Sequence, residues 1–168
     1  MANETIQRYM IGDYLECGIG ETKTYELMGA GFNTLDETPG AQSDSKTYIN
    51  DRAASSNVKS YQTVFAFESD MIKSEKAVME LYKVGRNHLT GAEAQKNYVR
   101  VDLYDPVAEH ENLYRARKFL ISVEVADCKG SGGETIVVSG NLNAVGDPIE
   151  GYFDTKTKKF VTEIPAKA

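Results

Sequence analysis

The 168-residue sequence has no long apolar run and very few cysteines, and each shortage excludes a class of protein. No stretch approaches the roughly 20 apolar residues that a membrane-spanning helix requires. Residues 1–7 lack the basic and apolar regions of a signal peptide, so we expect a protein without a membrane anchor that is made in a cytoplasm and stays there. Cys17 and Cys128 have no CxxC spacing, and we expect both to be buried free thiols.

Basic side chains are also in deficit. Nineteen Lys and Arg against 25 Asp and Glu give a formal charge of -6 and a pI near 5.0, which disfavours tight binding to nucleic acid. The same balance suits a protein past which DNA must slide, because negative walls repel phosphate. The hydrophobic fraction of 41% is typical of a globular chain, and the length predicts a single domain over residues 1–168.

The strongest structural signal is alternation of apolar and polar residues, which is typical of half-buried β-strands. It is clearest in RKFLISVEVA, where Phe119, Ile121, Val123 and Val125 share one face. The segments that we expect to be strands are 8–17, 24–28, 47–50, 58–68, 98–104, 117–126 and 135–142, with a final hairpin around the polar turn 154–159. Residues 35–46, LDETPGAQSDSK, are almost wholly polar and predict a long exposed loop.

One helix is predicted over residues 74–84, where apolar residues recur with helical spacing. Asp70 or Ser74 supplies an N-cap oxygen, and Gly85 stands where a left-handed C-cap belongs. Thr90 and Glu93 have capping-box spacing, although that segment has room for only about one turn. About eight strands, one helix and short connections predict a mainly β fold, an antiparallel sandwich or barrel with one flanking α-helix.

Chemistry-bearing residues do not form a recognisable site. The triplet of Glu109, His110 and Glu111 holds possible metal ligands, but adjacent side chains point in different directions and favour a solvated loop. The segment KGSGGE lacks the lysine and helix of a phosphate-binding loop and reads as a hairpin connection. Tyrosines spread over separate strands are better explained by packing and subunit contacts than by stacking on nucleic acid. We therefore predict no catalytic residue, no cofactor and no metal.

The second half of the chain carries a more specific pattern. From residue 117 it runs through a strand, a glycine-rich hairpin, a second strand with a Gly-Asn turn, and GDPIEGYFD before a last strand. This arrangement resembles the carboxy-terminal half of bacteriophage tail tube (major tail) proteins. The amino-terminal half is similar too, with a polar loop, the strand 58–67 and a single helix. The residues of the turn motif are Gly146, Asp147, Pro148, Gly151, Phe153 and Asp154.

The resemblance implies a non-enzymatic subunit that forms hexameric rings, which stack into a tube through which the genome passes without specific binding. It implies a place in the virion tail after assembly in the host cytoplasm. The implied partners are other copies of the chain, a tape measure protein, a tail terminator, baseplate or tail tip proteins and, in a contractile tail, a sheath protein. Type VI secretion tube proteins are related in fold, so fold alone does not separate a virus from a bacteriocin-like particle or a secretion device.

Within this interpretation some residues become candidates for assembly. The predicted loop would order on contact with a second ring; its candidate residues are Leu35, Asp36, Glu37, Pro39, Gly40, Asp44 and Lys46. Asp102 and Glu124 either face the lumen or are ordinary solvated positions. The alternatives are a head–tail connector or tail terminator ring protein, a secretion-type tube protein, a small-ligand-binding β-barrel and an enzyme.

Overall fold

The computed structural model describes residues 3–167, which form eleven β-strands and one α-helix, with 51% of the chain in strands. The prediction of a mainly β fold with one helix is confirmed. The strands are β1 (Ile11–Cys17), β2 (Thr24–Leu27), β3 (Phe32–Thr38), β4 (Ala41–Lys46), β5 (Ser55–Tyr61), β6 (Val64–Asp70), β7 (Gln95–Pro106), β8 (Leu113–Lys129), β9 (Val137–Ala144), β10 (Ile149–Asp154) and β11 (Lys159–Val161). The helix α1 spans Lys76–Arg86.

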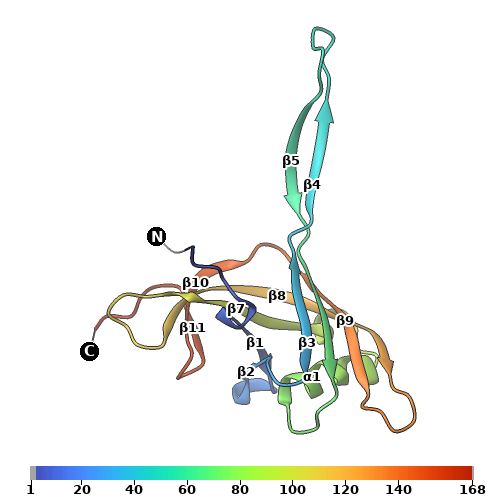
Figure 1. Cartoon of the computed structure of the whole chain (residues 1–168), viewed down its shortest axis with the longest axis vertical. Helices are drawn as coiled ribbons and strands as arrows, with labels where there is room; N and C mark the ends of the chain where they lie inside the picture. Colours follow the sequence, from blue (N-terminus) through green and yellow to red (C-terminus); the bar gives the residue numbers. More distant parts are fainter. Residues whose placement is uncertain (1–2, 168) are drawn as a thin grey trace.

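One antiparallel sheet, in the order β2-β1-β7-β8-β9-β6-β3, curls into a half-barrel (Figure 1). The 17-residue strand β8 organises it: β7 pairs with one edge, while β10 and β9 share the other edge along its length. Strands β10 and β11 form the hairpin predicted around residues 154–159, with Asp154 opposite Lys159. Strand β2 pairs antiparallel with β1, with Tyr14 opposite Leu27.

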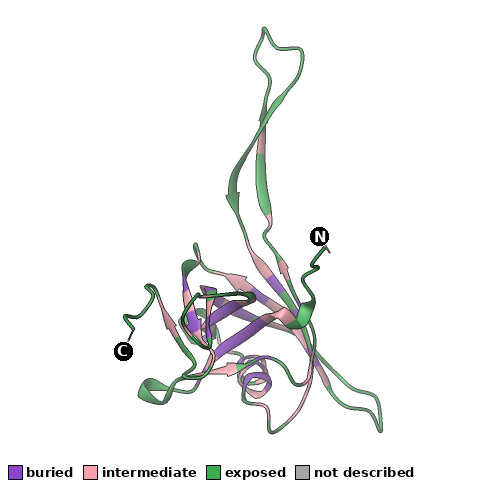
Figure 2. Cartoon of the chain, turned by 60° about the vertical axis from the view of Figure 1, so that its left-hand side comes forward, coloured by how far each residue is buried: buried purple, intermediate pink, exposed green. Residues whose placement is uncertain are grey.

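The core has two parts, one on each side of the curled sheet (Figure 2). The larger part lies under α1 and contains the predicted apolar face of β8, with Phe119, Ile121 and Val123 all buried. The smaller part is covered by the β10–β11 hairpin, which brings Phe153 to within 4.4 Å of the Tyr14 ring between ring centroids. Alternate residues of β7 and β8 therefore serve both parts of the core.

The helix begins and ends slightly later than the sequence predicts. Neither Asp70 nor Ser74 caps it: the N-cap is Glu75, and its side chain makes no capping hydrogen bond. At the other end the left-handed residue is His88, with φ of 50°, and its N–H donates to the Gly85 carbonyl at 3.3 Å. Gly85 is thus a helical residue and not the predicted cap.

A packing requirement explains the glycine at position 85. A Cβ atom placed there would lie 2.8 Å from the Cβ of Val125 on β8, which is too close for any side chain. The glycine is therefore needed for close contact between the helix and β8 and not for its backbone conformation. The Thr90–Glu93 segment forms the expected single turn, a 3₁₀ helix over Gly91–Ala94, but without a side-chain capping bond from Thr90.

The predicted loop over residues 35–46 is wrong, because the segment belongs to β3 and β4 with only Pro39 and Gly40 between the strands. The short strand predicted at residues 47–50 is instead a turn, and the strand predicted over 58–68 is broken at Gln62 and Thr63 into β5 and β6. The sequence of β4 predicts a loop because both faces of the strand are in contact with solvent. Its residues are therefore polar throughout and do not alternate with apolar ones.

The cysteines also differ from expectation. Cys17 is a buried free thiol, as predicted, and burial raises its pKa to about 12, with Glu80 adding to the effect. Cys128 is free but exposed, near the end of β8 where the strand has run past the core. No helix in residues 3–167 is long and apolar enough to span a membrane.

Candidate assembly surface

Strands β4 and β5 form a separate two-stranded sheet, here called the arm (residues 41–61), which projects from the body of the molecule (Figure 1). Pairing runs from Ala41 opposite Tyr61 to Lys46 opposite Ser55. Every residue of β5 is exposed, and no other strand in the described chain pairs with either outer edge of the arm. The arm therefore has backbone donors and acceptors available on both sides.

The tip of the arm exposes two large apolar side chains, although the arm as a whole is polar. Ile49 is fully exposed, and Tyr48 keeps 66% of its surface in contact with solvent. Val58 and Tyr61 add exposed apolar surface nearer the body. Side chains of this size at the end of a projecting element form a surface suited to contact with another protein, since aromatic residues are enriched in interfaces.

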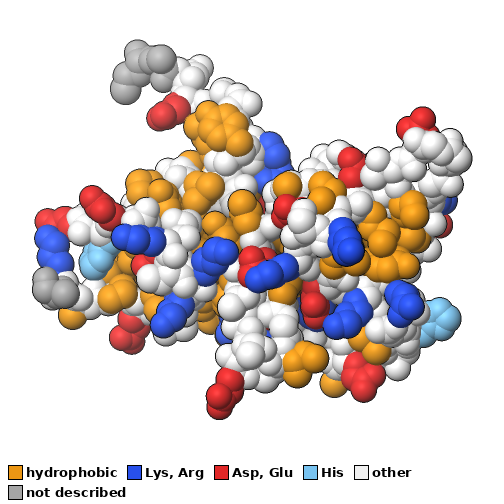
Figure 3. Space-filling model, turned by 90° about the horizontal axis from the view of Figure 1, so that it is seen from below, with side chains coloured by type: hydrophobic (Ala, Val, Ile, Leu, Met, Phe, Trp, Pro, Cys, Tyr) orange, Lys and Arg blue, Asp and Glu red, His pale blue; other side chains and the backbone are white. Residues whose placement is uncertain are grey.

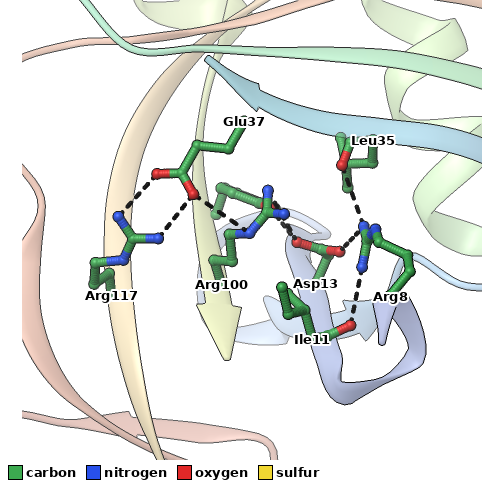
Figure 4. Close-up of polar contacts among 8 residues, drawn as sticks. Arg8, Ile11, Asp13, Leu35, Glu37, Arg100 and Arg117 are labelled. Carbon is green, nitrogen blue, oxygen red and sulfur yellow. Dashed lines mark hydrogen bonds and ion pairs between the residues drawn. The ribbon is translucent and has the colours of Figure 1, made fainter. Parts of the chain in front are cut away.

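The root of the arm is fixed by an ionic contact across the half-barrel. Glu37 lies on β3, three residues before the glycine at which the chain enters the arm. Its two carboxylate oxygens accept hydrogen bonds of 2.9 and 3.0 Å from Arg117 on β8 (Figure 4). Arg100 on β7 brings its Nε to 3.7 Å from the same carboxylate. A bidentate arginine pair restrains both distance and orientation.

A second carboxylate extends this contact to β1. Asp13 accepts hydrogen bonds from the Tyr98 hydroxyl and from Arg8, whose Nη2 lies 2.6 Å from Oδ2. Arg8 also donates to the carbonyl of Leu35 at 3.2 Å, so it joins β1 to β3, two strands that do not pair. The Arg8, Asp13, Glu37, Tyr98, Arg100 and Arg117 side chains form what we call the root network.

The charges of the root network stabilise one another. Burial acts to raise the pKa of Glu37, but the hydrogen bonds and charge of Arg117, with Arg100, outweigh it and hold that pKa below its usual range. The same contact raises the pKa of Arg117. Burial, reinforced by Asp13, raises the pKa of Tyr98 well above that of a free tyrosine. At neutral pH Glu37 and Arg117 are therefore both ionised, and the Tyr98 hydroxyl is neutral.

The residues that the sequence suggested for contact between rings differ in burial and in their position in the fold. Leu35 is buried in the core, and Glu37 is engaged in the root network. Pro39 and Gly40 form the junction between body and arm, where the Gly40 carbonyl accepts the Gln62 N–H at 3.0 Å. The other candidates, Asp36, Asp44 and Lys46, remain at least partly exposed, the last two on the arm itself.

Asp102 and Glu124 lie on opposite faces of the sheet. Asp102 is opposite Arg115 in the β7–β8 register and shares the face of Arg117, whereas Glu124 alternates to the other face of β8. Burial, together with Asp105 and Glu150, raises the pKa of Asp102 against the opposing effect of Arg117. Glu124 is exposed and accepts a hydrogen bond of 3.0 Å from Asn143. One face of the sheet cannot present both to a channel.

The turn motif that carries the family resemblance has a structural role in the β10–β11 hairpin. Gly146 adopts a positive φ of 77° in the turn before β10. A Cβ at Gly151 would overlap the Val161 carbonyl, so only glycine fits beside β11. Phe153 is fully buried. The Asp154 carboxylate accepts the N–H groups of residues 156 and 157 at 2.8 and 3.0 Å and closes the hairpin. Asp147 and Pro148 complete the turn.

Glu109, His110 and Glu111 lie in the turn between β7 and β8, where Glu109 itself has a positive φ of 65°. Within residues 3–167 no three His, Cys, Asp or Glu side chains are grouped closely enough to hold a metal ion. The other histidine of the chain, His88, lies two residues after the end of α1.

The root network was not predicted from the sequence, although the sequence contains an indication of it. Asp13 interrupts the apolar strand 8–17, whereas Arg100 stands at a polar position of the alternating strand 98–104, where the alternation predicts exposure. A charged residue at an inward position of a strand predicts a buried partner. The partner of each comes from a different strand, however, and neither the topology nor the curl of the sheet can be read from local alternation.

No protein-family model matches the sequence. No curated protein matches it. Ten chains in solved structures do match. One belongs to the cryo-EM structure of the anti-feeding prophage (AFP) baseplate, 6-fold symmetrised; 88% of this chain aligns with 95% of that chain at 9% sequence identity, with a TM-score of 0.49.

Proposed function

We propose that the protein is a structural subunit of a phage or phage-like tail tube, which self-assembles into hexameric rings that stack into a channel for DNA delivery. The subunit works by contact with its own copies and not by catalysis. The turn motif of residues 146–154 and the resemblance that it carries give the class of assembly. The physical support comes from the arm.

The observation that carries the proposal is an arm that no other part of residues 3–167 covers. An isolated two-stranded hairpin is marginal in water, because it buries too little surface to offset its conformational entropy. The arm nonetheless exposes all of β5 and, at its tip, the apolar side chains of Tyr48 and Ile49. Such an element gains stability when a neighbouring subunit covers it, and the root network holds it in position for that contact.

The open edges of the main sheet support assembly into rings. Strands β2 and β3 each pair on one side only in the described chain, so the half-barrel ends in unpaired backbone groups. Rings of subunits cover such edges and convert a tendency to aggregate into specific contact. The formal charge of -6 suits a channel that DNA traverses without being held.

The partners follow from this role. A tube subunit contacts copies of itself, and we propose further contacts with a tape measure protein, a tail terminator and baseplate or tail tip proteins. A sheath protein joins them in a contractile tail. The proposed location is the virion tail, after assembly in the cytoplasm of a bacterial host.

Negative-stain electron microscopy of the concentrated protein tests the proposal. Long hollow tubes are the expected result. Isolated rings that never stack would favour a head–tail connector or tail terminator. A protein that remains monomeric at every concentration would overturn the assignment.

A further inference from the structure

A groove of about 480 Å³ lies between β2 and the β10–β11 hairpin. Four lysines and one glutamate line it, together with two aromatic rings, which gives the groove a net charge of +3 in a chain of net charge -6. Its charged and aromatic lining residues are Lys23, Lys118, Lys158, Lys159, Glu26, Tyr25 and Phe160. We call this feature the lysine groove.

The positive charge of the lysine groove is only partly neutralised within the chain. Glu26 is already engaged by Lys158 at 3.5 Å and by Lys76 at 3.4 Å. Burial opposes ionisation of Glu26, but Thr24 and the two lysines outweigh it and lower its pKa. Lys23 lies 3.6 Å from the Glu16 carboxylate, whereas neither Lys118 nor Lys159 forms an ion pair within residues 3–167. The Lys118 ammonium lies 5.6 Å from the centre of the Phe160 ring, which holds it over the groove.

The walls of the groove are strand edges. Strand β2 pairs only with β1, and β11 pairs only with β10, so in the described chain each presents one unpaired edge. Figure 3, which views the molecule from below, shows Lys and Arg side chains interspersed with Asp and Glu on that face. Lysines grouped beside strand edges suit an acidic segment of another chain, because opposite charges across an interface give selectivity.

The chain itself contains a segment of complementary charge. Residues 102–112, DLYDPVAEHEN, carry four carboxylates and no Lys or Arg. Glu109 and Glu111 are exposed on the turn between β7 and β8, which projects at the left of Figure 1, and Asp105 is exposed near the end of β7. Within its own chain, the Glu109 carboxylate of this turn lies 3.0 Å from the Lys167 ammonium. Among residues 3–167, the turn forms no ion pair with a lysine of the groove.

We propose that the lysine groove receives the acidic β7–β8 turn of a neighbouring copy and that this contact joins adjacent subunits within the ring. The inference rests on the proposed function and names the surfaces that meet. Rings need such a contact, since a closed ring of identical subunits joins two different patches, one from each neighbour. A projecting acidic turn and a basic groove form a pair of this kind.

Charge reversal of each side tests the proposal. The first variant is K118E/K159E, and the second is E109K/E111K. Each alone places like charges at every contact and is expected to weaken assembly at least tenfold, as measured by mass photometry across a concentration series. An equimolar mixture of the two restores opposite charges at every contact and is expected to assemble again, in rings where the two variants alternate.

Matched controls separate charge at these sites from net charge. The variants K129E and E134K alter exposed residues outside both patches and should assemble as the unmodified protein does. Circular dichroism verifies that each variant is folded. Normal assembly of either double variant, or a mixture that stays dissociated while both variants are folded, would overturn the proposal without touching the tube assignment.

A second measurement does not depend on assembly. A fluorescent peptide with the sequence of residues 102–112 should bind the monomer, lose affinity with added salt and bind K118E/K159E at least tenfold more weakly. Equal affinity for both proteins, or no binding at low salt, would count against the groove. If the unmodified protein forms no oligomer yet binds the peptide, the tube assignment fails and the groove remains.

Discussion

Glu37 and Arg117 are 80 positions apart in the sequence, yet the carboxylate of one accepts two hydrogen bonds of 2.9 and 3.0 Å from the guanidinium of the other. The contact ties β3, which leads into the arm, to the central strand β8. A projecting hairpin can be useful for assembly only if its direction is fixed, and this pair lies next to the junction where that direction is set.

Replacing Glu37 with glutamine should lower the free energy of unfolding by about 1–3 kcal/mol. The reason is that Arg100 and Arg117 would keep their charges in a partly buried place without the carboxylate that compensates them. Urea denaturation at pH 7 measures the effect. Glu150→Gln is a matched control, because Glu150 is largely exposed and its distance from Arg115 is 3.9 Å, so its loss should be nearly neutral.

The stabilisation by Glu37 should disappear in acid. Its pKa is lowered in the folded protein, so the contribution is fully present above the pKa of an unfolded glutamate, about 4.3, and is lost as pH falls through the folded value. The difference in unfolding free energy between the unmodified protein and E37Q should therefore be constant from neutral pH to about 5 and shrink below about 4. A difference that stays constant down to pH 3 would show that the charge is not responsible.

Gly151→Ala should destabilise the protein by about 1–3 kcal/mol, since the added Cβ meets the Val161 carbonyl and must push β11 away from β10. Thermal unfolding measures this cost. Gly132→Ala provides the comparison: no atom lies within 4 Å of a Cβ at that position, and little change is expected. Equal stability of the two variants would mean that the hairpin does not pack as described.

Removal of the arm should separate folding from assembly. Gly40 and Gln62 already share a backbone hydrogen bond of 3.0 Å, so a two-residue Asn-Gly turn can replace residues 41–61 without strain. No arm residue belongs to the buried core, and the melting temperature should change by only a few degrees. Stacked assemblies should be lost. A shortened chain that still forms tubes would remove the arm from the stacking contact.

Local sequence patterns predicted most strands of the body. Alternation in β7 and β8 was sufficient because each strand has a buried face, and Phe119 and Ile121 lie where the period places them. The helix was also predicted, with errors at its ends. The prediction of Gly85 as a C-cap was wrong because glycine is favoured both at close contacts between elements and in left-handed turns. Only the position of Val125 shows that the close contact is the reason here.

The arm and the root network could not be predicted from local sequence patterns. A strand exposed on both faces, such as β4, has no alternation to reveal it, and its serines and Pro39–Gly40 junction match a loop in composition. The root network joins residues of β1, β3, β7 and β8, whose meeting depends on how the sheet curls. Strand order and curl are set by long-range packing, which a single sequence does not display.

End-on views of the assembled protein test the central claim most directly. The measurement is two-dimensional class averaging of electron micrographs in which particles stand on the support film. Hollow rings with six-fold symmetry are the predicted result, and their side views should show the same rings stacked. Averages with no central channel, or a protein that yields only monomers at high concentration, would contradict the assignment to a tail tube.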